Sequence, residues 1–454
     1  MKHKDKTLKW LRAAWMLCCM ALLPATASAQ QQWTLRDCID YALTHNISLQ
    51  KKRLTRLSAT EDLRQSEAAL LPSLSASTNQ SVGYRPWTSS GVTTVTNGTV
   101  NTSVRKTYYN GSYGLNASWT VWNGNRNHNQ VKLNQLAEQQ AELDSALTAN
   151  TIQEQIAQYY VQILYLNEAL NVSRQSLEAS KKNEERGREM VEVGKMSKAD
   201  LAQLTAQRAT DEYNIVAAES EIANYKLRLK QLLEITDAEF DIAIPAASDE
   251  QALRQIPALT SVYESALATR PEIQGSRINI QSSDVQLSLA EAQSLPTISM
   301  TGGIGTSTNS LSSNGWGDQF KTNVDMSVGA TVSIPIFDNR SSRTAINKAK
   351  LQQEQALLDL QDQQKQLYAT VEGYWLDAQT NQQKFRAALL SVDSEQQSYD
   401  LLSEQFRLGL KNIVELMNGK TNLLNAQQNK LQSKYMTILD LQLLHFYQGE
   451  RMDL

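Results

Sequence analysis

The sequence of 454 residues carries the same order of motifs twice. The stretch ALTHNISLQKKRL at 42–54 aligns without a gap with ALATRPEIQGSRI at 266–278. The prolines of LLPSL and SLPTI, at 72 and 296, are separated by the same offset. Because a repeated sequence unit folds into a repeated structural unit, we predict that 34–233 and 258–446 are two copies of one unit.

Further along each copy, the difference in residue number between matching motifs is smaller, which indicates that a loop between the motifs differs in length. The motif IAQYYVQI at 156–163 matches VEGYWLDA at 371–378, and Gly194 matches Gly409 at the same offset. Around the first of these motifs, apolar residues recur with spacings of three and four, which is the seam of a coiled coil. The seam consists of Ile152, Ile156, Tyr159, Ile163, Leu166 and Leu170, and its weaker counterpart consists of Val371, Tyr374, Ala378, Asn381 and Phe385.

Nothing interrupts this helical pattern between about Arg126 and Val193. At 1.5 Å per residue such a helix would be roughly 100 Å long, which is more than a compact domain can use. The faces away from the seam are rich in Gln, Asn, Ser, Lys and Glu, which tolerate water. The pattern therefore predicts a soluble rod or the wall of a water-filled tube.

Between the helices the hydrophobic period falls to two, which predicts four strands, two in each copy. Strands of roughly ten residues that alternate apolar and small polar side chains are typical of outer-membrane barrels, although a soluble sandwich alternates in the same way. On the predicted apolar face lie Leu74, Ala76, Thr78, Val82, Tyr109, Tyr113, Leu115, Ala117, Trp119, Val121, Ile298, Met300, Ile304, Val324, Met326, Val328, Ala330, Val332, Ile334 and Ile336.

Aromatic residues near the predicted strand ends favour the membrane interpretation, because aromatic side chains gather at lipid–water interfaces. They are Tyr84, Trp87, Tyr108, Tyr109, Trp316 and Phe320. A sheet in lipid has to close so that all backbone groups are paired, and bacterial barrels start at about eight strands. Four strands therefore predict a fraction of a barrel. Two chains would form a narrow barrel filled by side chains, and three would form a twelve-stranded conduit.

Residues 1–29 have the features of a secretory signal peptide. A basic start precedes the apolar run AAWMLCCMALL, and Ala27, Ser28 and Ala29 form a cleavage site. Without this segment, which holds five Lys or Arg and one Asp, 39 basic and 46 acidic residues remain, a net charge of −7. This acidic balance argues against a nucleic-acid partner. Cys38 is left alone, so no internal disulfide is expected, and no later segment is apolar enough to predict a transmembrane helix.

An enzyme is poorly supported by these residues. His45, His128 and His445 are scattered without the spacing of metal ligands, and the sequence has no glycine-rich phosphate loop or nucleophile–base arrangement. We therefore expect no catalytic, metal or cofactor site. The alternative from another class is a soluble periplasmic coiled-coil scaffold or adaptor-type protein. A plain porin is a second alternative, but porin walls are nearly all strand.

Each long helix is expected to stop at a glycine and to restart within a few residues. Gly194 and Gly409 suit the position just past a helix end. The stretches SKAD at 197–200 and NIVE at 412–415 have the spacing of a capping box. Local stability is a complete explanation of these residues. In an oligomer, however, the tips would form a ring, and a ring of acids at a constriction would select and gate by electrostatics.

Together these motifs resemble the TolC-like outer-membrane efflux proteins. The resemblance covers nearly the whole mature sequence and rests on WTLRDCIDYAL, LLPSL and SLPTI, IPIFDNR, the YY and YW pairs and the two glycine tips. It implies an α+β membrane protein that forms a homotrimer, with one twelve-stranded barrel in the outer membrane and a helical tunnel in the periplasm. It also implies a passive exit duct of a tripartite efflux or type I secretion system, which receives substrates from a periplasmic adaptor and an inner-membrane pump.

The resemblance also assigns roles to residues of the tips. Adaptor contacts of the form Gly-x-x-(Ser/Thr) fall on Gly194, Lys195, Met196 and Ser197, and in the second copy on Gly409, Leu410, Lys411 and Asn412. The periplasmic gate of the family falls on Asp200, Phe406, Lys411 and Glu415. This sequence departs from the family pattern at Asn412, which replaces a hydroxyl, at Phe406, which replaces a tyrosine, and at Asn418, which replaces a second acid.

The expected order of segments follows from these motifs. The first part contains N-terminal periplasmic helices (30–71), a transmembrane hairpin with an extracellular loop (72–122) and a long helical hairpin (123–233) with its tip at 194–200, and an equatorial linker (234–257) joins it to the second copy. The second copy contains helices (258–295), a second transmembrane hairpin (296–337), a second helical hairpin (338–446) with its tip at 409–415, and a C-terminal tail (447–454).

Overall fold

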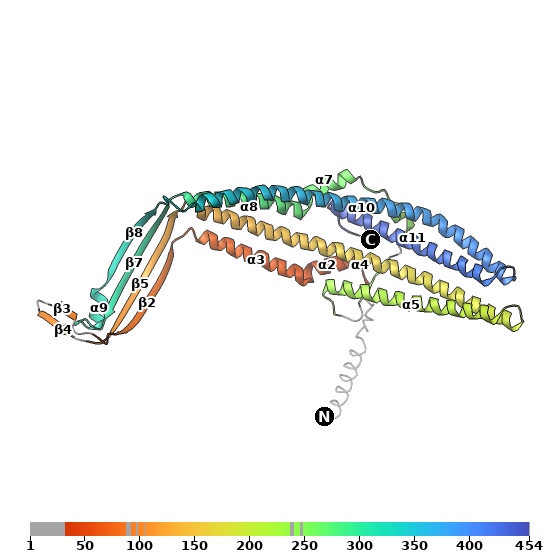
Figure 1. Ribbon diagram of the computed structural model, residues 1–454, viewed down its shortest axis with the longest axis horizontal. Helices are drawn as coiled ribbons and strands as arrows, with labels where there is room; N and C mark the ends of the chain where they lie inside the picture. The colour runs from red at the N-terminus through yellow and green to blue at the C-terminus, as the bar shows by residue number, and fades with distance from the viewer. Residues whose placement is uncertain are drawn as a thin grey trace, which may run out of the picture.

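The computed structural model describes residues 32–87, 92–96, 99–103, 105–236, 240–245 and 248–453. The predicted signal peptide lies outside these residues. The molecule is elongated, with a four-stranded sheet at one end and long helices along the rest of its length (Figure 1). No described helix combines the length and the apolar composition that crossing a bilayer requires.

Two helical hairpins form most of the rod. Helix α4 (Arg126–Glu192) packs against α5 (Lys198–Leu233), and α10 (Ser341–Arg407) packs against α11 (Ile413–Tyr447). Helices α4 and α10 have 67 residues each, and they begin and end at the same offset that separates the two glycine tips. The predicted uninterrupted helix is thereby confirmed, and its length is about 100 Å.

In each half, a shorter helix lies along the part of the rod that is nearer the sheet. Helix α3 (Ile47–Ala68) lies along α4, and α8 (Pro271–Glu291) lies along α4 and α10. The Asn46 side chain accepts a hydrogen bond from the Leu49 N–H at the start of α3, and Pro271 occupies the first turn of α8, where a missing N–H costs nothing. Each helix therefore begins at a residue suited to its first turn.

The core lies midway along the rod, where α2 (Leu35–His45) and α7 (Leu259–Thr269) pack against the long helices. The predicted seam is buried there, since Ile156, Ile163 and Phe385 have no exposed surface. These positions recur at helical spacing, so one face of each long helix supplies the core.

The predicted linker 234–257 is packed against the rod. Strand β6 (Asp241–Ile242) pairs in parallel with β1 (Gln32–Trp33). The short helix α6 (Asp249–Ala252) follows, and its Ala252 is buried against Phe385 and Ile438. This segment therefore packs against the middle of the rod. It connects the two halves covalently and also contacts both of them.

The sheet takes two strands from each half. Its order is β2 (Ser73–Tyr84), β5 (Thr107–Trp122), β7 (Thr297–Asn309) and β8 (Asp325–Ser333), and all neighbours are antiparallel. A separate small hairpin of β3 (Val92–Thr96) and β4 (Thr99–Ser103) lies in the connection from β2 to β5. Strands β5 and β7 are central, so β2 and β8 are the two edges of the sheet.

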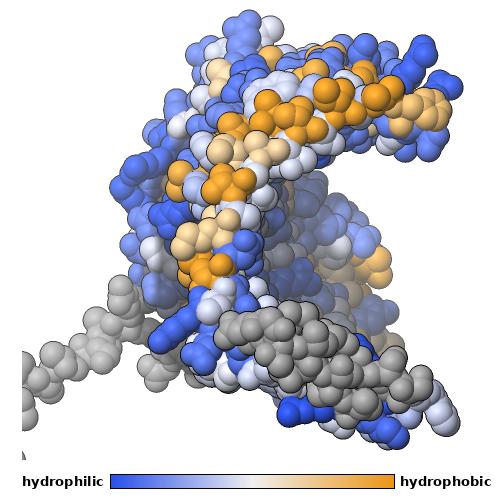
Figure 2. Space-filling model, turned by 90° about the vertical axis from the view of Figure 1, so that its left-hand side faces the viewer, coloured by the Kyte–Doolittle hydropathy of each residue, from blue (hydrophilic) through white to orange (hydrophobic). Residues whose placement is uncertain are grey.

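The register places the apolar side chains of all four strands on one face. Leu74 is opposite Ala117, Leu115 is opposite Ile304, and Ile304 is opposite Met326. The other face carries Ser, Asn, Thr and Gly, because successive side chains of a strand point to opposite sides. Seen from the sheet end of the molecule, hydrophobic residues follow a curved row around a hollow (Figure 2).

The structure corrects the predicted strand limits. Strand β8 ends at Ser333 because Pro335 lacks the N–H that a ladder needs. Ile334 and Ile336 therefore lie beyond β8, and Val324 precedes it. Val121 has no partner in β7, because the register shifts between Thr120 and Trp122, so it belongs to a bulge rather than to the regular face.

The predicted aromatic girdle is also corrected. Tyr84 and Tyr109 lie on the apolar face near the strand ends, but Tyr108 is opposite Gly83 and therefore lies on the polar face. Trp316 and Phe320 belong to a short helix, α9 (Trp316–Thr322), in the connection between β7 and β8.

Candidate functional site

The first helical tip is a tight turn between α4 and α5. Gly194 has a φ of +73°, which favours glycine, and the N–H groups of Lys195 and Met196 both donate to the Met190 carbonyl. The Ser197 hydroxyl accepts a hydrogen bond from the Asp200 N–H at 3.1 Å and donates to the Asp200 carboxylate at 2.8 Å. The carboxylate does not reach back to the Ser197 N–H, so the predicted capping box is only half formed.

The second tip has the same backbone turn with a complete cap. Gly409 has a φ of +75°. The Asn412 side chain accepts from the Glu415 N–H at 3.0 Å, and the Glu415 carboxylate accepts from the Asn412 N–H at 3.3 Å. The capping box predicted here is confirmed. The Glu415 carboxylate also pairs with the Lys411 ammonium, and these two donors hold the pKa of Glu415 below its usual range.

Of the predicted gate residues, Lys411 and Glu415 form an ion pair with each other, whereas Asp200 is hydrogen-bonded to Ser197 of its own tip. Among the described residues, the ion pair recorded for Lys411 is with Glu415 rather than with Asp200. Phe406 is 2% exposed and lies inside the protein, so the structure does not present it as a surface group. Whether these positions meet across an assembly stays a prediction.

Phe406 belongs to a cluster that joins the two hairpins near their tips. The buried members come from α5, α10 and α11 and are Leu204, Phe406, Ile413 and Leu416. Met196 from the first tip packs against them, together with Tyr399 and Met417. Apolar contacts therefore join the two hairpins close to their tips.

Farther from the tips than this apolar cluster, a set of buried polar side chains also joins the two hairpins. Lys420 of α11 is 6% exposed, and its ammonium donates to Ser180 of α4 and to the carboxylate of Asp211 on α5. Asp211 is 3% exposed and also accepts from the Ser180 hydroxyl at 2.6 Å and from the Gln207 amide at 3.0 Å. Burial lowers the pKa of Lys420, and its hydrogen bond to Asp211 works against that shift.

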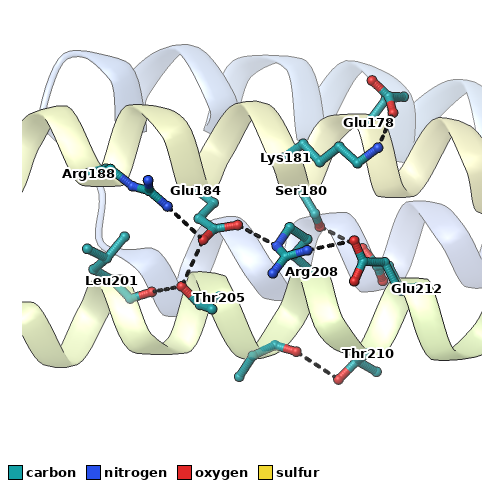
Figure 3. Close-up of polar contacts among 12 residues, drawn as sticks. Glu178, Ser180, Lys181, Glu184, Arg188, Leu201, Thr205, Arg208, Thr210 and Glu212 are labelled. Atoms are coloured by element: carbon teal, nitrogen blue, oxygen red, sulfur yellow. Dashed lines mark hydrogen bonds and ion pairs between the residues drawn. The ribbon is translucent and has the colours of Figure 1, made fainter.

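The first hairpin contains a second polar network closer to its tip (Figure 3). The carboxylate of Glu184 on α4 pairs with the Arg208 guanidinium of α5 at 2.6 Å and accepts from the Thr205 hydroxyl at 3.1 Å. Arg208 also pairs with Glu212 at 2.6 Å, and Arg188 approaches Glu184 at 3.4 Å. Glu184 thus links the two helices of this hairpin.

Sequence reasoning missed both polar networks. Their charged residues are scattered in Gln- and Glu-rich helices, and only the combined faces of three helices show which charges are buried. The sequence does offer one signal, since Gln207 and Asp211, like Arg208 and Glu212, are one helical turn apart. That spacing is equally common on solvated faces, so it could not have singled these residues out.

The tips expose apolar side chains and backbone rather than a reactive cluster. Val193, Leu408, Leu410 and Val414 are 54–71% exposed, and Gly194, Lys195 and Ser197 are exposed beside them. Within the described ranges, no three His, Cys, Asp or Glu side chains are close enough to hold a metal ion together. Cys38 is buried in α2, and burial raises the pKa of its thiol to about 12. The tips therefore present an exposed surface of mixed apolar and polar character.

Comparisons with known proteins agree with this architecture. A family model described as Outer membrane efflux protein matches residues 38–234 and 262–450. The chain is similar to the outer membrane efflux protein BepC of Brucella suis, at 22% identity over 96% of this chain and 89% of that protein. It is also similar to the outer membrane protein TolC of Vibrio cholerae, at 22% identity over 66% of this chain and 68% of that protein.

Solved structures share the fold over nearly the whole chain. One is CusC, with a TM-score of 0.79, 18% identity and coverage of 92% of both chains. Another is the CmeC outer membrane channel of Campylobacter jejuni, with a TM-score of 0.76, 19% identity and coverage of 92% of this chain and 86% of that chain.

Proposed function

Because the chain belongs to the outer membrane efflux protein family, we propose that three copies of it close one barrel and one helical tunnel. Members of this family are channels of the outer membrane, and the protein is an exit duct located there. The proposal concerns how one chain becomes a duct, which residues meet the partners, and where the duct closes.

The observation that best supports a trimer is that the sheet has one apolar face and two edges without a ladder partner. Within the described part of one chain, β2 and β8 each have a ladder partner on one side only. In lipid, open strand edges leave N–H and C=O groups unpaired at a cost of several kcal/mol each. Pairing of β8 with β2 of the next chain removes both edges. Three chains then supply twelve strands, which leave a lumen, whereas eight strands are filled by their own side chains.

We also propose that the two halves of the chain are copies of one unit. The support is the equal length of α4 and α10, and the constant offset in residue number from α4 to α10 and from α5 to α11. A trimer of such chains has six similar helical hairpins around its axis.

Cysteine cross-linking tests the closure of the sheet. Ser327→Cys on β8 is combined in turn with Ser77→Cys, Asn79→Cys or Ser81→Cys on β2, all on the polar face. A short bis-maleimide is expected to give covalent dimers and trimers, with no larger species, for at least one of these pairs. The buried Cys38 thiol does not compete for the reagent.

The matched control keeps Ser327→Cys and adds Gly303→Cys, the residue directly opposite it within the same chain. This pair is expected to give only cross-linked monomers. Bands beyond the trimer would show an open assembly. A purified mature protein that is a water-soluble monomer would favour the soluble scaffold instead.

We further propose that a periplasmic adaptor docks on the exposed tips, and that an inner-membrane pump supplies the energy. Around Gly194 a Cβ would meet no atom within 4 Å, so a bulky side chain would project into the docking surface. Gly194→Trp is expected to abolish export while trimers still assemble. Gly194→Asn is the matched control, because asparagine tolerates a positive φ. Normal export by the Trp variant would show that this tip is only a turn.

The gate is proposed to lie at the second tip, where Lys411 neutralises Glu415. Lys411→Glu places two carboxylates in contact, so the tips are expected to separate and the single-channel conductance in a planar bilayer to rise. Lys195→Glu makes the same change of charge on the first tip and is the control. An unchanged conductance of the Lys411 variant would remove Lys411 from the gate.

A further inference from the structure

Helix α9 packs against the apolar face of the sheet at the end away from the rods (Figure 1). The Tyr113 ring lies 6.3 Å from the Trp316 ring and 5.5 Å from the Phe320 ring, between centroids. The Thr306 hydroxyl donates to the Phe320 carbonyl at 2.9 Å. Tyr113 and Thr306 are directly opposite each other in the ladder, so α9 covers the face that also carries Leu115.

Hydrogen bonds fix α9 in this place. The Gln319 side chain is 5% exposed, accepts from the Asn309 N–H at 2.8 Å and donates to the Asn314 carbonyl at 2.7 Å. At the other end of the helix, the Asn323 amide donates to the Ser307 carbonyl at 2.7 Å. The helix is therefore docked on β7 by its buried side, and its orientation is defined.

The two sides of α9 that flank this docked side differ in polarity. Trp316 and Phe320 are one turn apart, pack on each other at 5.6 Å between ring centroids, and are 57% and 40% exposed. Asp318 and Thr322 form the corresponding pair on another side of the helix. Large exposed aromatic groups beside exposed polar ones are the pattern of a helix that lies in a membrane interface.

The aromatic side chains of α9 lie at the height where the apolar band of the sheet ends on the side away from the long helices. Tyr113, which contacts both rings, is six residues from Trp119 near the helical end of β5. Asn309, which donates to Gln319 of α9, lies farther out and is opposite Asn110, nine residues from Trp119. At about 3.3 Å per residue and a strand tilt of about 40°, nine residues span roughly 23 Å of height, which is close to the height of about 25 Å of the apolar band of an outer-membrane barrel. Trp316 and Phe320 therefore extend the outer limit of the band, and Asp318 and Thr322 lie on the other side of the helix.

The position of α9 selects lipid over a neighbouring chain as its partner. The helix contacts β7 and Tyr113 of β5, which are the central strands. The proposed seams between chains are at β2 and β8, on the outside of these strands. A helix that covers the middle of the lipid-facing surface meets lipid, whichever chain lies next to it.

We propose that α9 is an interfacial helix that lies in the outer leaflet of the membrane, with its aromatic pair at the boundary between headgroups and acyl chains. The inference rests on the proposed function, because it requires the apolar face of the sheet to face lipid. It assigns to the β7–β8 connection the task of fixing the depth of the barrel in the bilayer.

Quenching of the fluorescence of individual tryptophan residues tests this proposal. The full mature protein is reconstituted in phosphatidylcholine vesicles that contain phosphatidylcholine with a nitroxide on its acyl chain, either near the headgroup or near the chain end. The emission of Trp316 is the difference between wild type and Trp316→Phe, which keeps an aromatic ring. Iodide in the outer solution is the aqueous quencher.

Two further variants give the matched controls. Trp119→Phe reports a tryptophan on the apolar face at the other end of β5, where its indole N–H donates to the Leu70 carbonyl at 2.9 Å. Trp375→Phe reports a tryptophan of α10 that donates to the Pro257 carbonyl in the rod. We expect the Trp316 contribution to be quenched more by the nitroxide near the headgroup than by the deep nitroxide or by iodide, and the Trp375 contribution to be unaffected by either nitroxide.

The outcomes separate the two proposals. Quenching of Trp119 by lipid, with Trp316 quenched by iodide alone, would overturn the assignment of α9 and leave the proposed function standing. Absence of lipid quenching at both Trp119 and Trp316 would show that the sheet is not in the bilayer, and both proposals would fall. Lipid quenching at both positions, with Trp316 quenched more by the nitroxide near the headgroup, supports both, whereas stronger quenching of Trp316 by the deep nitroxide would overturn the interfacial position of α9.

Discussion

The two helical hairpins have matching lengths and turns, but their interiors differ. The first hairpin is charged where its helices meet near the tip, and the second is mostly apolar at the equivalent positions. Glu184, Arg208 and Asp211 of the first correspond to Tyr399, Leu423 and Ala426 of the second. The exception is Lys420, which takes the place of Thr205 and reaches into the first hairpin to pair with Asp211.

Because of this difference, the two hairpins have complementary buried charges. Asp211 is buried in the first hairpin and has no cation of that hairpin paired with it among the described residues, and Lys420 of the second hairpin supplies one. A buried charge without a partner is strongly unfavourable. Each hairpin therefore depends on the other for its stability.

The largest effect is expected from removal of this shared charge. Lys420→Met leaves the Asp211 carboxylate buried without a cation and should lower the free energy of unfolding by about 3–5 kcal/mol. Urea denaturation of the protein in detergent, followed by circular dichroism of the helices, measures this change.

The double variant Lys420→Met with Asp211→Leu is expected to recover most of that loss, because replacing a whole buried pair by apolar groups is often neutral. Arg407→Met, which breaks the exposed pair with Glu404, should change stability little. A loss in the double variant as large as in the single one would show that the pair does not join the hairpins.

A pH effect on stability is expected from Asp440 of the second hairpin. Burial raises the pKa of Asp440 on α11 to about 7, with an added contribution from Asp377, while the Asn381 amide opposes it. The folded protein therefore binds this proton more tightly than the unfolded chain, and the stability is lost as pH rises from about 4 to about 7. The loss should be about 4 kcal/mol, since a difference of one in pKa corresponds to about 1.4 kcal/mol.

Asp440→Asn is expected to remove this slope from the pH dependence of urea denaturation. The corresponding residue of the first hairpin is Tyr225, and Tyr225→Phe should leave the slope as it is. An unchanged slope in the Asp440 variant would assign the pH effect to other groups.

The next effect concerns a glycine–leucine contact that appears in both hairpins with the helices exchanged. A Cβ on Gly187 would lie 2.5 Å from a methyl carbon of Leu204, and a Cβ on Gly419 would lie 2.6 Å from one of Leu402. Gly187→Leu should therefore overpack the first hairpin and lower its stability by about 1–3 kcal/mol.

Gly187→Leu combined with Leu204→Gly copies the arrangement of the second hairpin and is expected to regain part of this loss in the same urea titration. If the double variant is no more stable than Gly187→Leu, the two contacts are not equivalent.

The smallest effect is expected at the caps. Ser197→Ala and Asn412→Ala each remove a side-chain acceptor at a helix start and should cost about 1 kcal/mol, which is about fivefold in local opening. The loss should be larger for Ser197, because its hydroxyl also donates to the Asp200 carboxylate, whereas alanine at position 412 keeps the backbone N–H that donates to Glu415. Hydrogen exchange of the Asp200 and Glu415 amides measures it, and Asn412→Ser should retain protection. Equal protection in all three variants would contradict a stabilising role of the caps.

Features that depend on one element at a time could be predicted from the sequence. Spacings of three and four predicted the buried seam at Ile156 and Ile163, and alternation predicted one apolar face for the sheet. The same reasoning failed where a single residue overrode the pattern, since Pro335 ended β8 before Ile334. The resemblance placed Phe406 at a gate; within one chain this side chain packs inside the protein, and its role in an assembly stays a prediction.

Features that depend on the meeting of distant elements could not be predicted in this way. Nothing around Lys420 marks it as buried, because its partners Ser180 and Asp211 are 240 and 209 residues away. The docking of α9 on Tyr113 is of the same kind, since Trp316 and Phe320 fit a strand end as well as a helix when they are considered alone.

The long helices, the glycine turns and the two-faced strands follow from the sequence alone, because each of them depends on side chains that are neighbours along one element. Only the tertiary structure decided which charges are buried, how the hairpins depend on each other and where α9 lies. The physical reason is that burial of a side chain depends on the rotation and height of the helices or strands packed against it, and a local pattern carries no information about either.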